Sequence, residues 1–348
     1  MMTSHCLHYY VGTYTDSPST STGIARITLN PDSGELTRLE DVTALRNPSY
    51  LTVTQVGLYS VSEVSRDEGA LVQFTSPLSS RQLAIAGDSP CHLAIKPPYL
   101  AVANYGSGNT SLFLLDEKGQ PQRALSELYI AGSGTNPDRQ RSPHAHQVCF
   151  FAHSNQLAVV DLGADQIHIY DYRVNAPGHK FTLTQTIPMP AGSGPRHLVF
   201  NKSETLAYLV CELSETVITL LKEQNKWHIV HQCDLLKNVK SEEAASAIQL
   251  SDDDRFLYVS CRAQNKICLF DVSSIEPIKI AEYDSGGAFP RDFTLSCDGL
   301  WLLVANQHSD NIVSFRRNRE TGELTPTGYQ CTVSVPVCLQ PVREYKSE

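Results

Sequence analysis

Two short segments of the chain combine histidine and arginine with proline. One reads Pro143-His144-Ala145-His146 and the other reads Gly194-Pro195-Arg196-His197. Because residues two apart in a strand point to the same side, His144 and His146 can act together. An arginine clamps a carboxylate or phosphate and keeps its charge, while a neutral histidine accepts a proton near pH 7. These residue types indicate a site that binds an anion and moves a proton.

Polar residues also follow the apolar, strand-like runs of the chain. We interpret seven of them as equivalent points of a repeat, namely Tyr14, Glu63, Asn104, Asp161, Glu212, Arg262 and Asn306. Glu212 and Arg262 are poor turn formers, so their positions directly after hydrophobic runs favour a functional role. For Asn104 and Asn306 a role in the turn itself is an equally good interpretation.

These two sets of residues predict one cluster where the repeats meet. The predicted catalytic residues are Glu212, His144, His146, Arg196 and Arg262, and the predicted substrate-binding residues are Arg291, His197, Asn104, Asp161 and Asn306, with Arg141 nearby in the chain. The set suits attack of water on an ester or lactone carbonyl, with arginine stabilising the oxyanion and Glu212 or a histidine acting as the base. We expect the neighbouring cations to lower the pKa of Glu212.

A metal site is the alternative interpretation of the histidines. His144 and His146 could hold a divalent ion together with Glu212 or Asp161. The surrounding arginines disfavour this because they repel a cation, so we predict no metal and no cofactor. The sequence has no Gly-x-Ser-x-Gly elbow and no glycine-rich loop that leads into Gly-Lys-Ser/Thr. A serine triad and a nucleotide phosphate loop are therefore not supported.

Composition narrows the classes of partner. The 348 residues carry a formal net charge of −9 and no basic block, so we expect no nucleic-acid binding. No apolar run is long enough to span a bilayer, and the first thirty residues lack the pattern of a secretory signal. The ten cysteines contain no Cys-x-x-Cys pair, which favours the reducing cytoplasm. We expect a small anionic lactone as substrate, no membrane association and no obligate protein partner.

A repeat of about fifty residues must position these side chains. Each copy begins with a short lead into an apolar strand, followed by a polar turn and a second strand, and copies begin near residues 48, 90, 143, 195, 245 and 290. A seventh copy is split between residues 333–339 and residues 8–14. The pattern predicts an all-β, seven-bladed β-propeller in one domain over residues 1–348, with about four antiparallel strands per blade. Strands from the two ends of the chain should complete one blade and close the ring.

Several ordered motifs carry a family resemblance over nearly the whole chain, from about Tyr10 to about Cys338. They include the two histidine and arginine segments above, Cys211-Glu212-Leu213-Ser214, and Val304-Ala305-Asn306-Gln307-His308. The chain resembles the seven-bladed propeller lactonases, which include the propeller-type bacterial 6-phosphogluconolactonases and the fungal carboxy-cis,cis-muconate cyclase. The resemblance implies a site of His144 or His146 with Arg196, Glu212 and Arg262.

The resemblance also implies an activity. The expected reaction is hydrolysis of 6-phosphogluconolactone to 6-phosphogluconate, a step of the pentose phosphate pathway in carbohydrate metabolism. Family members differ in substrate, so a cycloisomerase acting on a carboxylated muconate, which needs the same arginine clamp, is an alternative. A propeller that serves only as a non-catalytic interaction scaffold is a second alternative, because fold does not determine function.

Overall fold

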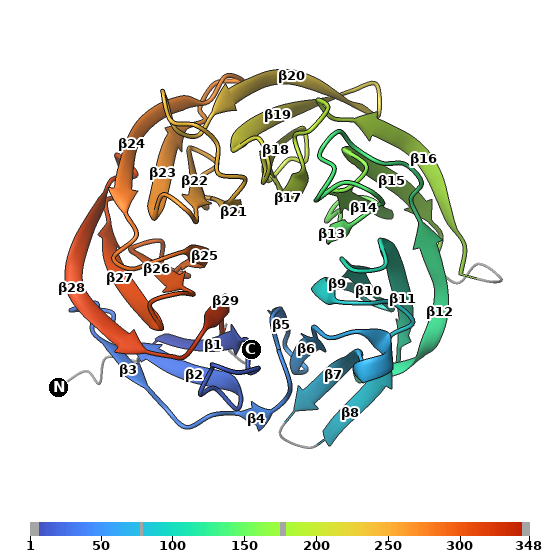
Figure 1. Ribbon diagram of the computed structural model, residues 1–348, viewed down its shortest axis with the longest axis horizontal. Helices are drawn as coiled ribbons and strands as arrows, with labels where there is room; N and C mark the ends of the chain where they lie inside the picture. The colour runs from blue at the N-terminus through green and yellow to red at the C-terminus, as the bar shows by residue number, and fades with distance from the viewer. Residues whose placement is uncertain (1–6, 77–78, 175–178, 343–348) are drawn as a thin grey trace.

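Seven antiparallel β-sheets stand like blades around a central channel in the computed structural model, which describes residues 7–76, 79–174 and 179–342 (Figure 1). Six of the sheets have four strands, and the seventh has four strands in its main path with a short fifth strand beside it. The second strands are short runs of valine, leucine, tyrosine and alanine, residue types that pack well in the middle of a buried sheet. The predicted all-β, seven-bladed propeller is confirmed.

The blades are numbered in chain order, and the strands of each blade follow one another from the channel outward. Blade 1 contains β29 (Pro336–Pro341), β1 (Leu7–Thr13), β2 (Gly23–Leu29) and β3 (Leu36–Arg38), with β4 (Thr43–Ala44) beside β2. Blade 2 contains β5 (Leu51–Val53), β6 (Leu58–Ser62), β7 (Leu71–Ser76) and β8 (Ser79–Ala84), and blade 3 contains β9 (Pro90–Lys96), β10 (Tyr99–Asn104), β11 (Asn109–Leu115) and β12 (Pro121–Tyr129). Blade 4 contains β13 (Ala145–Phe150), β14 (Gln156–Asp161), β15 (Gln166–Tyr172) and β16 (Phe181–Pro188), and blade 5 contains β17 (Pro195–Phe200), β18 (Leu206–Cys211), β19 (Thr216–Glu223) and β20 (Lys226–Asp234). Blade 6 contains β21 (Ala245–Leu250), β22 (Phe256–Cys261), β23 (Lys266–Asp271) and β24 (Ile278–Asp284), and blade 7 contains β25 (Pro290–Leu295), β26 (Trp301–Asn306), β27 (Asn311–Arg317) and β28 (Leu324–Thr332).

The strand directions bring particular loops to one end of the channel. The first strand of each blade lies nearest the axis, and its neighbours follow outward as antiparallel strands (Figure 1). The start of each inner strand and the turn between the second and third strands therefore lie at the same end. We call this end the channel mouth. The only helix among the described residues is a single 3₁₀ turn, η1 (Arg66–Glu68), and none is long and apolar enough to cross a membrane.

The two ends of the chain close the ring in blade 1. Strand β1 pairs with β29 on one side and with β2 on the other, with Val11 opposite Leu339 and Gly12 opposite Cys338. The amide of Tyr14 also donates to the carbonyl oxygen of Val335 over 3.1 Å. Closure supplies the inner strand of blade 1, so β1 is paired on both sides and is not left as an open edge that could pair with another chain. The predicted pairing of residues 333–339 with residues 8–14 is confirmed.

The hydrophobic core is divided among the interfaces between neighbouring blades. At the interface of blades 7 and 1, for example, Trp301 and Leu303 pack with Tyr9, Ile27 and Leu339. Each interface buries its own apolar cluster of this kind. Stability therefore depends on a closed ring of contacts, each of which needs both neighbouring blades in place.

Leu339→Ala tests how much the closing strand contributes. Leu339 is buried at the interface of blades 7 and 1, so the substitution should lower the free energy of unfolding by about 2–5 kcal/mol through lost burial and a new cavity. Urea unfolding followed by circular dichroism measures the change. Ile278→Ala is the matched control because Ile278 is 63% exposed, and it should stay within about 0.5 kcal/mol of wild type. Equal effects of the two substitutions would contradict a role for β29 in stability.

Candidate active site

β-Bulges at the start of the inner strands direct side chains into the channel mouth. In five blades one extra residue follows the first residue of the inner strand, and these extra residues are Val337, Cys91, His146, Arg196 and Arg291. A bulge bends the strand and re-aims the side chain at that point. Three of the predicted site residues therefore owe their direction to the same local irregularity in three different blades.

The carboxylate of Glu212 is the centre of the cluster. Arg139 donates from Nη2 to Oε1 over 2.6 Å, and Arg196 donates from Nε to Oε2 over 3.0 Å. Nη2 of Arg262 is also 3.0 Å from Oε2, and Nε2 of His146 lies 3.8 Å from the same oxygen. Glu212, Arg196 and Arg262 are each less than 10% exposed. The structure thus brings four of the five predicted catalytic residues together.

These contacts determine the charge states of the cluster. Burial alone would raise the pKa of Glu212, but the positive charges of Arg262 and Arg196 outweigh it and hold this pKa well below its usual range. Burial and the neighbouring Arg262 lower the pKa of Arg196 to about 10, which leaves the guanidinium charged near neutral pH. Glu212 is therefore a permanent anion among permanent cations.

Three histidine rings line the mouth in their neutral form. The ring of His197 lies 5.3 Å from the ring of His146 and 5.3 Å from that of His92, edge to face in both pairs. Burial, followed by the charge of Arg196, lowers the pKa of His92 to about 3 and holds the pKa values of His146 and His197 well below 6.5. These imidazoles bind protons poorly at neutral pH and provide neutral polar edges.

A second hydrogen-bonded group completes the mouth from blades 7, 1 and 2. Arg291 donates from Nη2 to the hydroxyl of Tyr14 over 2.7 Å, and Tyr14 donates that hydroxyl to Oε2 of Glu63 over 3.0 Å. The guanidinium carbon of Arg291 also lies 5.0 Å from the centre of the Tyr14 ring. Burial raises the pKa of Glu63, although Arg291 opposes this shift. We call these three residues the Tyr14 group.

His144 is the predicted catalytic residue that does not contact Glu212. It precedes β13, donates from Nδ1 to the carbonyl oxygen of Tyr105 over 2.6 Å and stacks on the Tyr105 ring at 4.5 Å. His146 lies on another side of the same ring, 5.5 Å away and edge to face. The two histidines share a neighbour, but only His146 reaches the Glu212 carboxylate.

Three predicted substrate-binding residues serve the turns beside the second strands. Asn104 donates to the side chains of Asn109 and Ser111, Asn306 donates to the carbonyl oxygen of Ser285, and Asp161 accepts from the amides of His144 and Ala164. The pairing register of the strands explains why these three side chains contact the turns. Asn104, Asp161 and Asn306 pair with the inner strand in the same way as Cys211 and Cys261 do, so Glu212 and Arg262 occupy the next position along. The seven residues interpreted as equivalent therefore belong to two neighbouring positions, whose side chains point in different directions.

Sequence reasoning missed the arginine that completes the Glu212 cluster. Arg139, in the loop after β12, contacts Glu212 and also donates to the Tyr105 hydroxyl over 3.1 Å. Arg141, the residue noted from the sequence, is exposed and pairs with Asp138. No motif distinguishes the two arginines. Tyr105 could have been found, because it follows Asn104 just as Glu212 follows Cys211.

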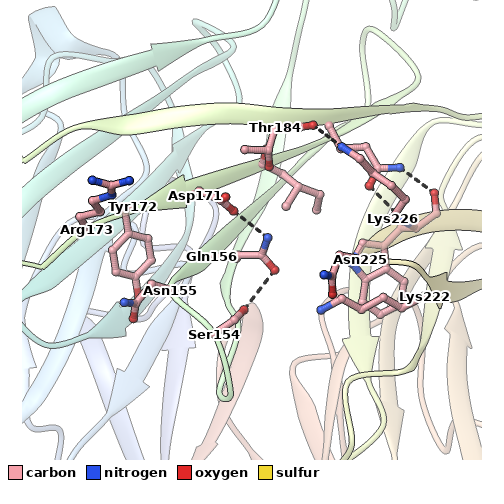
Figure 2. A pocket seen from close by; sticks show the side chains of 13 residues that line it. Ser154, Asn155, Gln156, Asp171, Tyr172, Arg173, Thr184, Lys222, Asn225 and Lys226 are labelled. Carbon is pink, nitrogen blue, oxygen red and sulfur yellow. Dashed lines mark hydrogen bonds between the residues drawn. The ribbon is translucent and has the colours of Figure 1, made fainter.

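A hollow lies away from this cluster, between blades 4 and 5. It has a volume of about 500 Å³ and is lined by residues that include Tyr172, Lys222 and Trp227 (Figure 2). Ser154 and Asn155, in the turn between β13 and β14, place it at the end of the propeller opposite the channel mouth. Nowhere in residues 7–76, 79–174 and 179–342 do three or more His, Cys, Asp or Glu side chains gather in a way that could hold a metal ion.

Comparison with known proteins agrees with this fold. The family model described as "Lactonase, 7-bladed beta-propeller" matches residues 8–341. The chain is 30% identical to a 6-phosphogluconolactonase of Bacillus subtilis, covering 95% of this chain and 97% of the relative. It is also 30% identical to a 6-phosphogluconolactonase of Formosa agariphila, with 95% and 98% covered. The solved structure of a periplasmic gluconolactonase of Pseudomonas aeruginosa superposes with a TM-score of 0.89 at 28% identity, covering 97% of this chain and 99% of that one.

The chain therefore belongs to the lactonase family of seven-bladed β-propellers. The resemblance noted from its motifs is confirmed.

Glu212→Gln tests whether this carboxylate holds the cluster together. Removing the anion leaves buried guanidinium groups uncompensated, so the free energy of unfolding at pH 7 should fall by about 3–5 kcal/mol. The pKa of Glu212 is lower in the folded chain than the value of 4.5 for an unperturbed glutamate. Its stabilisation is therefore complete above about pH 4.5 and is lost as the pH falls through the folded value.

Urea unfolding at pH 7 and at pH 3.5 measures this dependence. The difference between wild type and Glu212→Gln should be smaller at pH 3.5 than at pH 7. Glu68→Gln is the control, because Glu68 pairs with Arg46 at the exposed surface, and it should stay close to wild type. A Glu212→Gln protein as stable as wild type at pH 7 would refute the stabilising role.

Proposed function

We propose that the protein hydrolyses a sugar lactone, with 6-phosphogluconolactone as substrate and 6-phosphogluconate as product. The observation that carries the proposal is the charge of the channel mouth. Its two hydrogen-bonded groups together contain four guanidinium groups, those of Arg139, Arg196, Arg262 and Arg291, against the two carboxylates of Glu212 and Glu63. An excess of cations at the mouth of a protein of net charge −9 favours an anionic ligand.

Arg196 and Arg262 are the proposed contacts for the lactone carbonyl. Glu212 holds both guanidinium groups in place and leaves Nη2 of Arg196 without a hydrogen-bond partner among the residues that the structure describes. Fixed cations at the carbonyl oxygen stabilise the negative charge that develops when water attacks the carbon. In this proposal Glu212 is a positioning residue, because a carboxylate that accepts three charged donors is a weak base.

The names of the relatives support a lactone substrate, either with or without a phosphate. Two relatives at 30% identity are named 6-phosphogluconolactonase, which favours the phosphorylated lactone. The Pseudomonas aeruginosa structure is named a gluconolactonase, which favours the same reaction without the phosphate. The proposal assigns the phosphate to Arg139, the cation of the Glu212 cluster that does not contact the carbonyl.

The proposed compartment is the cytoplasm. The nine cysteines in the described part of the chain are all free, as is usual in a reducing environment. The Pseudomonas aeruginosa protein is named periplasmic, so cell fractionation with an antibody against this protein is the direct measurement.

The substrate assignment is tested by direct assay of purified protein. Hydrolysis of 6-phosphogluconolactone and of gluconolactone is followed near pH 6.5, with the spontaneous ring opening subtracted. We expect kcat/KM for the phosphorylated lactone to be at least about tenfold higher, because one extra charge-assisted contact contributes about 1.5–3 kcal/mol. Activity that survives exhaustive chelation agrees with the arginine site, whereas activity lost to a chelator and restored by a divalent ion favours the metal alternative. No acceleration of either lactone would refute the proposal.

Arg196→Ala tests the carbonyl contact. Loss of one donor to the developing oxyanion should reduce kcat/KM by about 2–4 kcal/mol, or roughly 30- to 1,000-fold. Arg141→Ala is the matched control, since the Arg141 side chain is 77% exposed, and it should keep wild-type kinetics. If the two variants have the same kcat/KM, Arg196 does not have the role assigned to it.

A further inference from the structure

We propose that Glu63 is the proton acceptor for the attacking water, held in place by Tyr14 and Arg291 across the channel from Glu212. This inference rests on the proposed lactone hydrolysis. It assigns a catalytic residue in blade 2, outside the set that the family resemblance implies. The two carboxylates then have separate tasks, one positioning cations and the other receiving a proton.

The positions of the blades place the two carboxylates on opposite sides of the channel. Glu63 follows β6 of blade 2, and Glu212 follows β18 of blade 5. Figure 1 shows β6 and β18 facing each other across the central opening. A ligand in the mouth can therefore contact the guanidinium groups around Glu212 on one side and the Tyr14 group on the other.

The hydrogen bonds of the Tyr14 group leave Glu63 as an acceptor. A tyrosine hydroxyl has one proton, and Arg291, which can only donate, occupies a lone pair of the Tyr14 oxygen at 2.7 Å. The hydroxyl proton therefore points to Oε2 of Glu63 at 3.0 Å. Burial raises the pKa of Tyr14, so the hydroxyl keeps this proton at neutral pH. Glu63 is thus fixed by a neutral donor through one oxygen.

Glu212 is surrounded by cationic donors, whereas Glu63 has a neutral donor. Both of its oxygens are occupied by guanidinium groups, with Arg139 on Oε1 and Arg196 and Arg262 on Oε2. A carboxylate with three cationic partners loses its affinity for a proton, whereas one with a neutral partner keeps it. Paired carboxylates with divergent surroundings are the arrangement in which one carboxylate takes part in proton transfer and the other stays ionised.

The charged and titratable neighbours of Glu63 agree with this division. Burial raises its pKa above 4.5, while Arg291 on β25, the Ser49 hydroxyl, the Tyr14 hydroxyl and Arg196 on β17 each lower it. The Cys91 thiol on β9 has its own pKa raised by burial and by Glu63, so it stays neutral. The neighbouring histidines are held neutral by burial and by Arg196, which makes them poor proton acceptors near pH 7.

The proposed step conserves atoms and charge. The water oxygen forms a bond to the lactone carbonyl carbon as one water proton passes to Glu63, and the carbonyl oxygen becomes an oxyanion beside Arg196 and Arg262. The bond between the carbonyl carbon and the ring oxygen then breaks, and the ring oxygen takes the proton from Glu63. The product is an open-chain hydroxy acid, and Glu63 returns to its ionised form.

The pH dependence follows from the direction of the shift. A base must be ionised to act, so the rate falls as the pH drops through the pKa of Glu63. Because that pKa is raised, the acidic limb of the kcat/KM profile should lie above pH 4.5. Tyr14→Phe removes a hydrogen bond that lowers the pKa, so in this variant the limb should move to higher pH while KM changes little.

The test compares Glu63→Gln, Tyr14→Phe and wild type in full-length protein. Hydrolysis of 6-phosphogluconolactone and gluconolactone is measured from pH 4.5 to 8, and binding of 6-phosphogluconate is measured by calorimetry. Glu63→Gln should lower kcat by about 100-fold or more, lose the acidic limb and bind the product within about threefold of wild type. Glu117→Gln, an exposed residue in the turn after β11, is the matched control and should keep wild-type values.

Three results obtained with an active wild-type protein would overturn the assignment alone. Glu63→Gln with more than a third of wild-type kcat would exclude Glu63 as the proton acceptor. Loss of product binding together with turnover would make Glu63 a structural anchor. If Glu63→Gln does not fold, an acidic limb of Tyr14→Phe at the wild-type position would also reject the proposal. A wild-type protein that hydrolyses neither lactone would refute the proposed function itself, and this inference with it.

Discussion

The buried carboxylate of Glu212 is the charge on which the channel mouth depends. Arg139, Arg196 and Arg262 come from a loop and two different blades, and each lies within 3.0 Å of this one group. Without an anion between them, three guanidinium groups at this distance would repel one another in surroundings that screen charge poorly. Glu212 therefore makes it possible to hold a concentrated positive charge in a protein that is acidic overall.

The propeller supplies the rigidity that this arrangement needs. Arg196, Arg262 and Arg291 are each fixed by their own blade, and the blades cannot move apart while β29 and β1 keep the ring closed. The bulges that direct His146, Arg196 and Arg291 are parts of paired strands, so the backbone that carries these side chains is held in place by the sheets. A site built from strand starts and strand-end turns loses little conformational entropy when a ligand binds.

The sequence predicts more of the fold than of the site, and the reason lies in the range of the interactions. A blade is specified locally, because apolar strands and polar turns follow one another along the chain, and the repeat then shows how many blades there are and how the ring closes. The contacts of Arg139 with Glu212 and of Tyr14 with Glu63 join residues 73 and 49 positions apart, and no local pattern records them. The error in aligning Asn104 with Glu212 has a similar origin. The strands β10 and β18 end at equivalent positions, Asn104 and Cys211, but the apolar run stops before Asn104 in one and includes Cys211 in the other, so a hydrophobic pattern is misaligned by one residue. Arg196 can be identified from the sequence because the repeat itself places it at the start of an inner strand.

The closed ring also accounts for the contrast between the two carboxylates. Blades 5 and 6 provide Arg196, Glu212 and Arg262, whereas the Tyr14 group comes from blades 7, 1 and 2. If Glu63 lay on the same blade as Glu212, the same guanidinium groups would hold both carboxylates as weak bases. Because they are separated across the channel, Glu212 is paired with guanidinium groups on both oxygens while Glu63 keeps a neutral hydroxyl partner. In the proposed mechanism, a lactone bound between them meets cations at its carbonyl oxygen on one side and a proton acceptor on the other, so the spacing of the blades separates the electrophilic and basic functions proposed for the site.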